Sequence, residues 1–344
     1  MQRCIELARL GAGDVAPNPM VGAVLVYGDR IIGEGYHKQY GLAHAEVNCI
    51  NSVTAEDAKL IADSVMYVSL EPCAHFGKTP PCADLLIKHN IRKVVVGCRD
   101  PFEAVNGKGI EKLQAAGVEV IVGVLESECI ALNHAFFTFH TKKRPYIILK
   151  WAQSADGFIA SKTQKNAAER VFITNDITNK LVHKWRSETA AIMVGTETAL
   201  KDDPSLTTRL WQGKDPVRIV IDRSLRLPET LKLFDRSVLT IILNDLQSSR
   251  EKELWYCKID DAIHPLHSIC NILYQENLNS VLIEGGARLL QSFIDAGLWD
   301  EARTITNRSL LLHEGVPAPV LNIGRLIKRE NYLGDEMAYI VNGS

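Results

Sequence analysis

Residues 72–82 read PCAHFGKTPPC, and this stretch decides how the first half of the chain folds. Its prolines, glycine and histidine exclude the middle of a helix or strand, so it predicts a shaped loop. Upstream of it, His44 and Glu46 open a predicted helix. The imidazole of His44 and the thiolates of Cys73 and Cys82 can occupy three of the four positions of a tetrahedral zinc ion. The spacing therefore predicts one zinc ion per chain.

Three protein ligands leave the fourth zinc position open for water, which is typical of a catalytic site. Zinc can lower the pKa of such a water toward ~7, and Glu46, which is not needed as a ligand, can carry a proton to a leaving amine. Zinc nucleobase deaminases share this layout with two residues between the cysteines, whereas eight separate them here. Two alternatives stay open: side chains that merely pack, and a closed structural zinc site with His75 as fourth ligand.

Short apolar runs alternate with helical patterns along the whole chain, which predicts the α/β class for both halves. In the first half, a hairpin around Gly28-Asp29-Arg30 is followed by strands and helices in alternation, which indicates a largely parallel sheet covered on both faces. A break at Lys142-Lys143-Arg144-Pro145 separates a domain over 1–142 from one over 145–344. In the first, strands are expected at 21–27, 31–37, 65–70, 94–98 and 118–124, and helices at 44–52, 82–90, 109–116 and 127–140. In the second, strands are expected at 146–152, 191–195, 217–222, 238–243 and 280–286, and helices at 176–188 and 287–296.

Composition narrows the class of protein. A length of 344 residues with 46% hydrophobic residues suffices for two cores, and a formal net charge of -2 disfavours a nucleic-acid partner. Apolar runs stay shorter than the ~20 residues that a membrane helix needs, and the first residues do not resemble a signal peptide. We therefore expect a cytoplasmic protein with reduced cysteines and no membrane partner, in which the six cysteines other than Cys73 and Cys82 are small buried hydrophobic residues. A homo-oligomer is also expected, although no feature of the sequence fixes the oligomeric state.

Four motifs in order resemble the deaminase half of the bifunctional riboflavin-biosynthesis deaminase/reductase family: APNPMVGAV (16–24), HAE (44–46), PCAHFGKTPPC (72–82) and DPFEAVNGKG (100–109). The resemblance implies a cytidine-deaminase-like three-layer α/β/α fold. It makes His44, Cys73 and Cys82 the zinc ligands and Glu46 the proton shuttle, with Asn18, His75 and Lys78 lining the substrate pocket. The sequence departs from the family at Phe102-Glu103, where Asn-Pro is common.

The residues alone leave two of these roles open. Asn18 lies between prolines, where its amide can complete a turn or face the edge of a base. Lys78, in a Gly-Pro loop, can bind a phosphate or simply extend into solvent.

Further motifs resemble the reductase half of the same family: LKWAQSADGFIA (149–160), VGTETALKDDPSLTTR (194–209) and LIEGGARLLQSFI (282–294). The resemblance implies a dihydrofolate-reductase-like α/β domain that uses NADPH. The NADPH contacts would be Ala152, Phe172 (in place of a common tryptophan), Thr174, Thr198, Asp202, Gly286, Ala287, Arg288 and Leu289. The phosphorylated substrate would be held by Arg186, Leu206, Arg209 and Glu284. Lys150, at the end of a predicted buried strand, can orient the substrate, act as an acid or simply reach solvent. Arginines suit a phosphate because their planar donors can bind two oxygens at once, although Arg209 alone fits a surface ion pair equally well.

The expected function is a sequence of two reactions on pyrimidine ribose phosphates. By resemblance, hydrolytic deamination of 2,5-diamino-6-(5-phosphoribosylamino)pyrimidin-4-one precedes NADPH-dependent reduction of the ribosyl group to ribityl. No residue stands out as the proton donor of the reduction. Two other functions are considered: a nucleic-acid-editing deaminase, which the net charge disfavours, and a zinc-stabilised nucleotide-binding scaffold without turnover.

Overall fold

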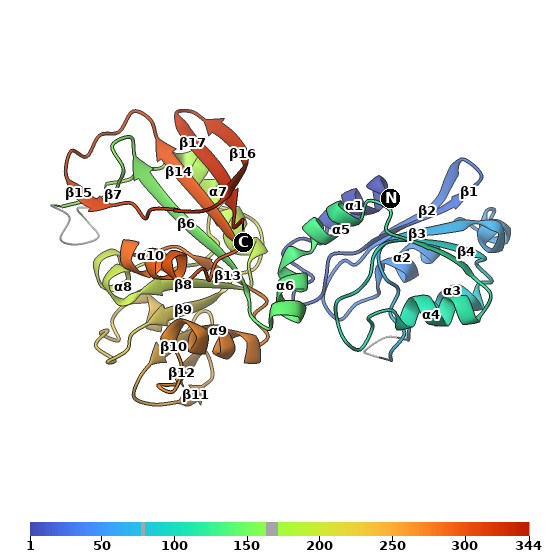
Figure 1. Cartoon of the computed structure of the whole chain (residues 1–344), viewed down its shortest axis with the longest axis horizontal. Helices are drawn as coiled ribbons and strands as arrows, with labels where there is room; N and C mark the ends of the chain where they lie inside the picture. Colours follow the sequence, from blue (N-terminus) through green and yellow to red (C-terminus); the bar gives the residue numbers. More distant parts are fainter. Residues whose placement is uncertain (77–79, 163–170, 344) are drawn as a thin grey trace. The chain divides into compact units, whose positions relative to one another are not determined.

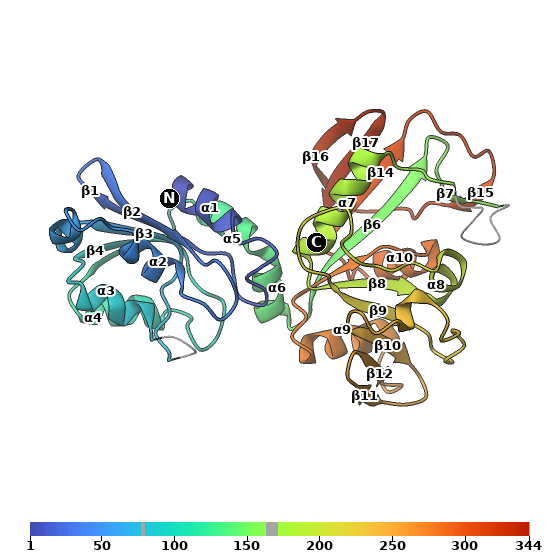
Figure 2. The same ribbon diagram turned by 180° about the vertical axis from the view of Figure 1, so that it is seen from behind.

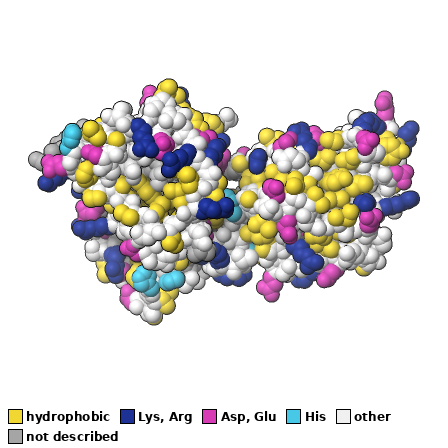
Figure 3. Space-filling view, turned by 45° about the horizontal axis from the view of Figure 1, so that its top comes forward, with side chains coloured by type: hydrophobic (Ala, Val, Ile, Leu, Met, Phe, Trp, Pro, Cys, Tyr) yellow, Lys and Arg dark blue, Asp and Glu magenta, His cyan; other side chains and the backbone are white. Residues whose placement is uncertain are grey.

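The computed structural model describes residues 1–76, 80–162 and 171–343. Contacts between residues divide the chain into two compact units, Met1–Lys143 and Arg144–Ser344, each of which has its own sheet and core (Figure 1). On the face displayed in Figure 3, Lys and Arg side chains are interspersed with Asp and Glu. Among the described residues, no helix has the length and apolar character needed to cross a membrane.

The first unit is built on a five-stranded sheet with the order β2-β1-β3-β4-β5. Its strands are β1 (Gly22–Tyr27), β2 (Arg30–Tyr36), β3 (Val65–Leu70), β4 (Lys93–Cys98) and β5 (Glu119–Val122). The expectation of a largely parallel sheet holds only for β3, β4 and β5, because β1 pairs antiparallel with both β2 and β3. The β1–β2 pair is a hairpin with a tight turn at Gly28, whose φ of +56° suits glycine, and so short a connection can join only antiparallel strands.

Helices cover both faces of this sheet and complete three layers (Figures 1 and 2). One layer holds α1 (Gln2–Arg9) and α5 (Glu126–Leu132), and the other holds α2 (Ala45–Asn51), α3 (Cys82–Lys88) and α4 (Lys108–Ala115). A short 3-10 helix spans Ala58–Asp63. An apolar cluster between α2, α3 and the sheet includes Leu25, Val68 and Leu86. The predicted α/β/α layering is confirmed.

The prediction of a single helix over 127–140 is wrong in one respect, because the chain forms two helices there, α5 and then α6 (His134–Lys142). Asn133 separates them and leaves helical geometry with a φ of -118°. Its side-chain amide donates to Met20 O at 2.8 Å and accepts from Met20 N at 2.8 Å. These two tertiary hydrogen bonds hold the break between the helices, and nothing in the local sequence indicates them.

The second unit contains a ten-stranded sheet with the order β11-β12-β10-β9-β8-β13-β6-β14-β17-β16. Its strands are β6 (Tyr146–Ser154), β8 (Ala191–Gly195), β9 (Val217–Ile221), β10 (Thr240–Asn244), β11 (Ser249–Glu251), β12 (Leu254–Lys258), β13 (Ser280–Ile283), β14 (Glu301–Asn307), β16 (Arg325–Tyr332) and β17 (Asp335–Val341). A separate pair is formed by β7 (Phe158–Ser161) and β15 (Gly315–Pro317). The run from β12 through β14, which includes all five expected strands, is parallel.

Helices pack on both faces of this sheet as well (Figure 1). The helices are α7 (Asp176–Glu188), α8 (Thr196–Asp202), α9 (Pro265–Gln275) and α10 (Ala287–Asp295), with a 3-10 turn at Lys232–Phe234. Leu149 and Ile283 face the core under α9 and α10. Because side chains alternate along a strand, the neighbouring Lys150 and Glu284 face the opposite side of the sheet.

A buried ion pair holds the first strand of the second unit in place. Arg144 donates from Nη1 and Nη2 to both carboxylate oxygens of Asp300, at 2.5 and 2.8 Å. The same carboxylate accepts the Ile147 N–H at 2.9 Å, and the two charged side chains are only 13% and 8% exposed. Removing one partner would leave a buried charge without compensation.

We predict that Asp300→Ala lowers the free energy of unfolding of the second unit by about 3–5 kcal/mol, because the Arg144 guanidinium loses its counterion. All five tryptophans belong to this unit, so tryptophan fluorescence during denaturant unfolding follows it selectively. Asp245→Ala is the matched control: it removes the Arg223–Asp245 pair, in which the arginine is 59% exposed, and should cost less than about 1 kcal/mol. Equal effects of the two substitutions would contradict the prediction.

Candidate functional site

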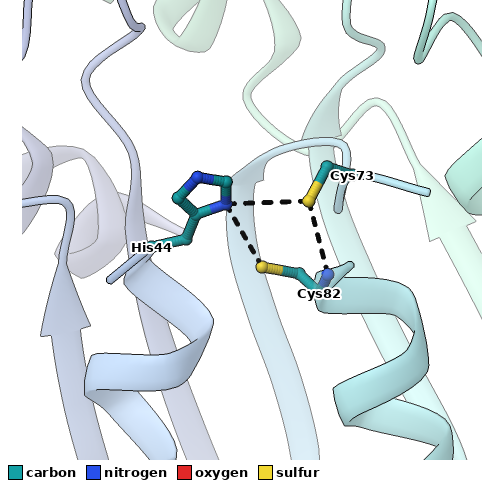
Figure 4. Close-up of side chains that lie close together, drawn as sticks. All are labelled: His44, Cys73 and Cys82. Carbon is teal, nitrogen blue, oxygen red and sulfur yellow. Dashed lines mark hydrogen bonds between the residues drawn. The ribbon is translucent and has the colours of Figure 1, made fainter. Parts of the chain in front are cut away.

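Three side chains from separate elements of the first unit meet as potential metal ligands (Figure 4). His44 precedes α2, Cys73 lies in the loop after β3, and Cys82 begins α3. His44 Nδ1 lies 3.6 Å from Cys73 Sγ and 3.4 Å from Cys82 Sγ. Metal–ligand bonds of ~2.0–2.3 Å place the corners of a tetrahedron about 3.5 Å apart, so the three atoms fit around one zinc ion.

The donor set also fits zinc electronically. Hydrogen bonds from Cys82 and His44 lower the pKa of the Cys73 thiol to about 4, which favours the thiolate that a metal requires. No fourth His, Cys, Asp or Glu belongs to the cluster among the residues that the structure describes. His75, weighed as a fourth ligand of a closed site, is exposed and its ring lies against Phe102 at 6.0 Å between centroids.

Glu46 lies in the first turn of α2, and only 3% of its surface is exposed. Burial raises the pKa of its carboxyl group, with a further contribution from the nearby Cys73. A raised pKa suits a group that must both accept and release a proton near neutral pH. Glu46 therefore has the surroundings of a proton carrier and stays outside the ligand cluster.

A cavity of about 250 Å³ opens over the ligand cluster. Asn18 and His75, the expected substrate contacts, line it together with His44, Glu46 and Cys73. The amide nitrogen of Asn18 lies 3.2 Å from His37 Nε2, and His37 Nδ1 lies 3.1 Å from Ala43 O. Lys78, the third expected contact, lies outside the described residues.

Glu71 ties the loop after β4 to the metal loop. Its Oε2 accepts the N–H groups of Asp100 and Gly107 at 3.2 and 2.9 Å, and its Oε1 accepts those of Gly109 and Ile110 at 3.0 and 3.3 Å. A Cβ at Gly109 would lie 1.8 Å from Pro72 O, so only glycine allows this approach. One buried carboxylate thereby fixes the wall of the cavity opposite α2.

The rim residue Phe102, where the sequence departs from the family, packs within an aromatic group. Its ring lies 4.9 Å from that of His140, which in turn lies 4.4 Å from that of Phe136. Burial lowers the pKa of His140 to about 4, so this histidine is neutral at physiological pH. Both phenylalanines line the cavity, so this part of the rim is apolar.

In the second unit, three expected substrate residues form one charged cluster. Arg186 on α7 donates from Nε and Nη2 to the two oxygens of Glu284, at 2.8 and 2.7 Å. Lys150 Nζ on β6 lies 3.9 Å from Glu284 Oε2, and all three side chains are at least 87% buried. The adjacent cations Arg186 and Lys150 lower the pKa of Glu284 to about 2 against the opposing effect of burial.

The other two expected substrate residues follow α8. Leu206 is buried and has a φ of +54°, and Arg209 is exposed. The Thr207 carbonyl between them accepts a hydrogen bond from Arg186 Nη1 at 3.1 Å. The loop that carries Arg209 is thereby attached to the charged cluster.

The expected NADPH residues are brought together in part. The Thr198 side chain of α8 packs against Gly285 and Gly286, the glycine pair before α10. A Cβ atom added at Gly285 would lie 2.8 Å from the Thr198 side chain, and one added at Gly286 would lie 3.3 Å from the same side chain. Leu289 reaches Gly195 from α10, while Ala152 is on β6 and Asp202 ends α8. Ala287 and Arg288 form the first turn of α10. Thr174 is half-buried before α7, and Phe172 keeps 75% of its surface exposed.

Known proteins match both units. Residues 1–98 match the cytidine and deoxycytidylate deaminase zinc-binding region, and residues 145–311 match the RibD C-terminal domain. Riboflavin biosynthesis protein RibD of Aquifex aeolicus is 40% identical over 305 residues, covering 87% of this chain and 83% of the relative. The Escherichia coli protein of the same name is 34% identical over 322 residues, covering 88% and 84%. The chain belongs to the RibD family.

Solved structures of RibD proteins show the same fold over the full length. A diaminohydroxyphosphoribosylaminopyrimidine deaminase/5-amino-6-(5-phosphoribosylamino)uracil reductase from Thermotoga maritima is 34% identical with a TM-score of 0.88, covering 99% of this chain and 97% of that one. Acinetobacter baumannii RibD is 32% identical with a TM-score of 0.88, covering 100% and 98%. The expected family and the expected pair of α/β domains are confirmed.

Sequence reasoning missed several residues that shape these sites. His37, Glu71 and Asp100 line the first cavity, and His183 accepts a hydrogen bond from the Arg209 main chain in the second unit. Glu71 directly precedes the Pro-Cys motif, and the position of this carboxylate next to the ligand loop is the one local signal that could have identified Glu71. Burial raises the pKa of Asp100 to about 7, although nothing in its DP dipeptide indicates that environment.

We predict that Glu71→Ala destabilises the first unit by at least about 3 kcal/mol, because four main-chain N–H groups lose their acceptor. Calorimetric unfolding of the whole chain measures this loss of stability. The zinc content of the purified variant shows whether the metal loop still binds the ion. Glu119→Ala is the matched control, since Glu119 is 61% exposed in a surface pair with Lys93 and should contribute less than about 1 kcal/mol. A Glu71→Ala protein as stable as the control would rule out the anchoring role.

We predict that Glu284 makes the second unit sensitive to acid. Its carboxyl group has an ordinary pKa of 4.5 and a folded-state pKa of about 2, so its contribution to stability is present above pH 4.5 and is lost as the pH falls toward 2. Glu284→Gln should flatten the pH dependence of unfolding in that window by up to about 1.4 kcal/mol per pH unit. Tryptophan fluorescence in urea between pH 2.5 and 6 measures it, and identical slopes for the two proteins would contradict it.

Proposed function

We propose that the chain catalyses two consecutive reactions on a pyrimidine ribose phosphate. The unit over 1–142 would deaminate 2,5-diamino-6-(5-phosphoribosylamino)pyrimidin-4-one. The unit over 145–344 would then reduce the ribosyl group of 5-amino-6-(5-phosphoribosylamino)uracil to ribityl with NADPH. One observation carries the proposal: in a RibD-family chain, His44, Cys73 and Cys82 converge beside the buried Glu46 in one cavity.

For the deamination, the ligands would be His44 Nδ1 and the sulfur atoms of Cys73 and Cys82. A zinc ion bound there supplies Lewis acidity and lowers the pKa of water in the open position. Glu46 accepts a proton from the attacking water and delivers it to the amine that leaves the ring. Its burial serves both transfers, because the neutral form is stabilised and the group can alternate between acid and base.

The cavity supplies the contacts that would orient the pyrimidine. Asn18 presents an amide that can donate to and accept from a base edge, and His37 holds its nitrogen end. His75 lies on the exposed rim, where it and Lys78 would face the ribose phosphate. Phe102 and Phe136 add apolar surface to the cavity lining, against which the ring of the substrate could pack.

For the reduction, the charged cluster would hold the phosphorylated substrate. Arg186 and Arg209 carry planar donors that match phosphate oxygens, while Glu284 holds Arg186 in place and Lys150 adds a third cation. NADPH bound against Thr198 and the Gly285-Gly286 turn would supply the hydride, with Leu206 and the remaining expected contacts shaping the site. The N-cap of α10, Gly286, has no side-chain capping hydrogen bond, so main-chain N–H groups at the start of this helix could bind a phosphate.

The proposal extends to where the enzyme works. We expect it in the cytoplasm as a homo-oligomer. All eight cysteines are free thiols, which suits a reducing compartment, and six of them are fully buried away from the metal site. Light scattering on the purified protein measures its oligomeric state.

We predict that Glu46→Gln lowers ammonia release by at least about 100-fold, because the amide cannot carry the proton. Zinc content should be unchanged, and NADPH consumption with 5-amino-6-(5-phosphoribosylamino)uracil should stay at the level of the unmodified protein. Glu56→Gln, an exposed glutamate of the same unit, is the control. Undiminished ammonia release by Glu46→Gln would exclude the assigned role.

A further inference from the structure

His183 is a buried histidine of the second unit for which the proposed function has no use. It lies on α7 one turn before Arg186, and 2% of its surface is exposed. Its Nδ1 accepts the main-chain N–H of Arg209 at 2.9 Å. The histidine thus connects the helix that carries one expected phosphate ligand to the loop that carries the other.

The hydrogen bond determines the state of the ring. Because Nδ1 accepts, it carries no proton, and the neutral ring must bear its hydrogen on Nε2. Protonation would place an N–H at Nδ1 against the N–H of Arg209. Burial, assisted by Arg186, Arg209 and Lys150 and opposed by Glu284, lowers the pKa of His183 to about 4. The acceptor is therefore available throughout the physiological pH range.

The loop that His183 holds is attached to α7 at a second point. Arg186 Nη1 donates to Thr207 O at 3.1 Å, and Arg209 Nη1 donates to Thr207 Oγ1 at 3.0 Å. Leu206 is buried with a φ of +54°, a backbone conformation that needs support from its surroundings. The His183 hydrogen bond supplies support directly beside the Arg209 side chain.

The two arginines joined in this way form a site with excess positive charge. Arg186 is paired with Glu284, while the described part of the chain forms no ion pair within 4.0 Å of Arg209. Burial and the charge of Arg186 lower the pKa of Arg209 against the opposing charge of Asp215, so the two guanidinium groups repel each other. An anion placed between them would remove this repulsion and bind through charge-assisted hydrogen bonds.

We propose that His183 is a positioning residue of the reductase site: through Nδ1 it holds the 206–209 loop so that Arg186 and Arg209 bind one phosphate monoester together. The inference rests on the proposed function, which supplies a sugar phosphate as substrate. His183 acts through Arg209 and makes no contact with the reacting atoms.

Two amide substitutions separate the roles of the ring nitrogens. His183→Asn places its side-chain oxygen near the position of Nδ1 and can still accept the Arg209 N–H. His183→Gln extends its amide toward the position of Nε2 and cannot. His267→Asn is the control, because His267 lies exposed on α9 of the same unit. Ribose 5-phosphate binding to the full chain by calorimetry is the first measurement, and KM and kcat of the reduction are the second.

We expect His183→Gln to weaken ribose 5-phosphate binding and to raise KM by about tenfold, with kcat changed less than about twofold, because the partly buried Arg209 N–H is left without its acceptor and the loop is no longer held. His183→Asn should stay within about threefold of the unmodified protein, and ammonia release by the first unit should be unchanged in both. Wild-type affinity in His183→Gln would overturn the inference. So would equal losses in the two variants, or a fall in kcat at constant KM, which would indicate a proton donor. Failure of the unmodified protein to bind ribose 5-phosphate or consume NADPH would instead refute the proposed function.

Discussion

Parallel pairing between neighbouring strands brings the chemical groups of both units to one edge of a sheet. In the first unit, β3 and β4 run side by side, so Glu71 and Asp100, which follow their carboxyl ends, meet over the metal loop. In the second, β6 and β13 are parallel neighbours, and Lys150 near the end of one strand reaches Glu284 after the other. Residues far apart in sequence become neighbours because the carboxyl ends of parallel strands coincide.

Buried charge is compensated differently in the two sites. Glu71 is surrounded by four main-chain N–H groups, which are rigid donors that hold a loop. Glu284 is compensated by the Arg186 guanidinium and Lys150, which together exceed its own charge. The first arrangement is satisfied within the protein and serves structure. The second leaves positive charge, which suits the binding of an anion.

The two proposed reactions act on different parts of two related pyrimidine ribose phosphates. Deamination acts on the ring, and the first unit offers a small cavity with a polar wall at Asn18 and Glu46 and an apolar wall at Phe102. Reduction acts on the sugar, and the second unit offers cations at Arg186 and Arg209 for its phosphate. The phosphate is common to both substrates, so it is a handle that each unit can hold while working on a different part of the molecule.

Much of the fold was visible in the sequence because parallel strands buried on both faces are continuous apolar runs, as at 191–195. One of the missed strands, β16, is of another kind. β16 is an edge strand with the sequence RLIKRENY, it is largely exposed, and its pairing with β17 is the interaction that orders it. The break at Asn133 was also invisible, because the two hydrogen bonds that hold it reach Met20 across the unit.

The sequence by itself determined the family, the domain types and the metal cluster of His44, Cys73 and Cys82, because ligand chemistry requires particular residue types in a particular order. Only the tertiary structure decided what Glu71, Asp100 and His183 do. Each is an ordinary residue in its local sequence, and its role comes from a partner that lies far along the chain. Glu71 accepts a hydrogen bond from the Asp100 main chain, and His183 accepts one from the Arg209 main chain. Hydrogen bonds formed across a fold depend on three-dimensional proximity, and no local pattern of residues encodes that proximity.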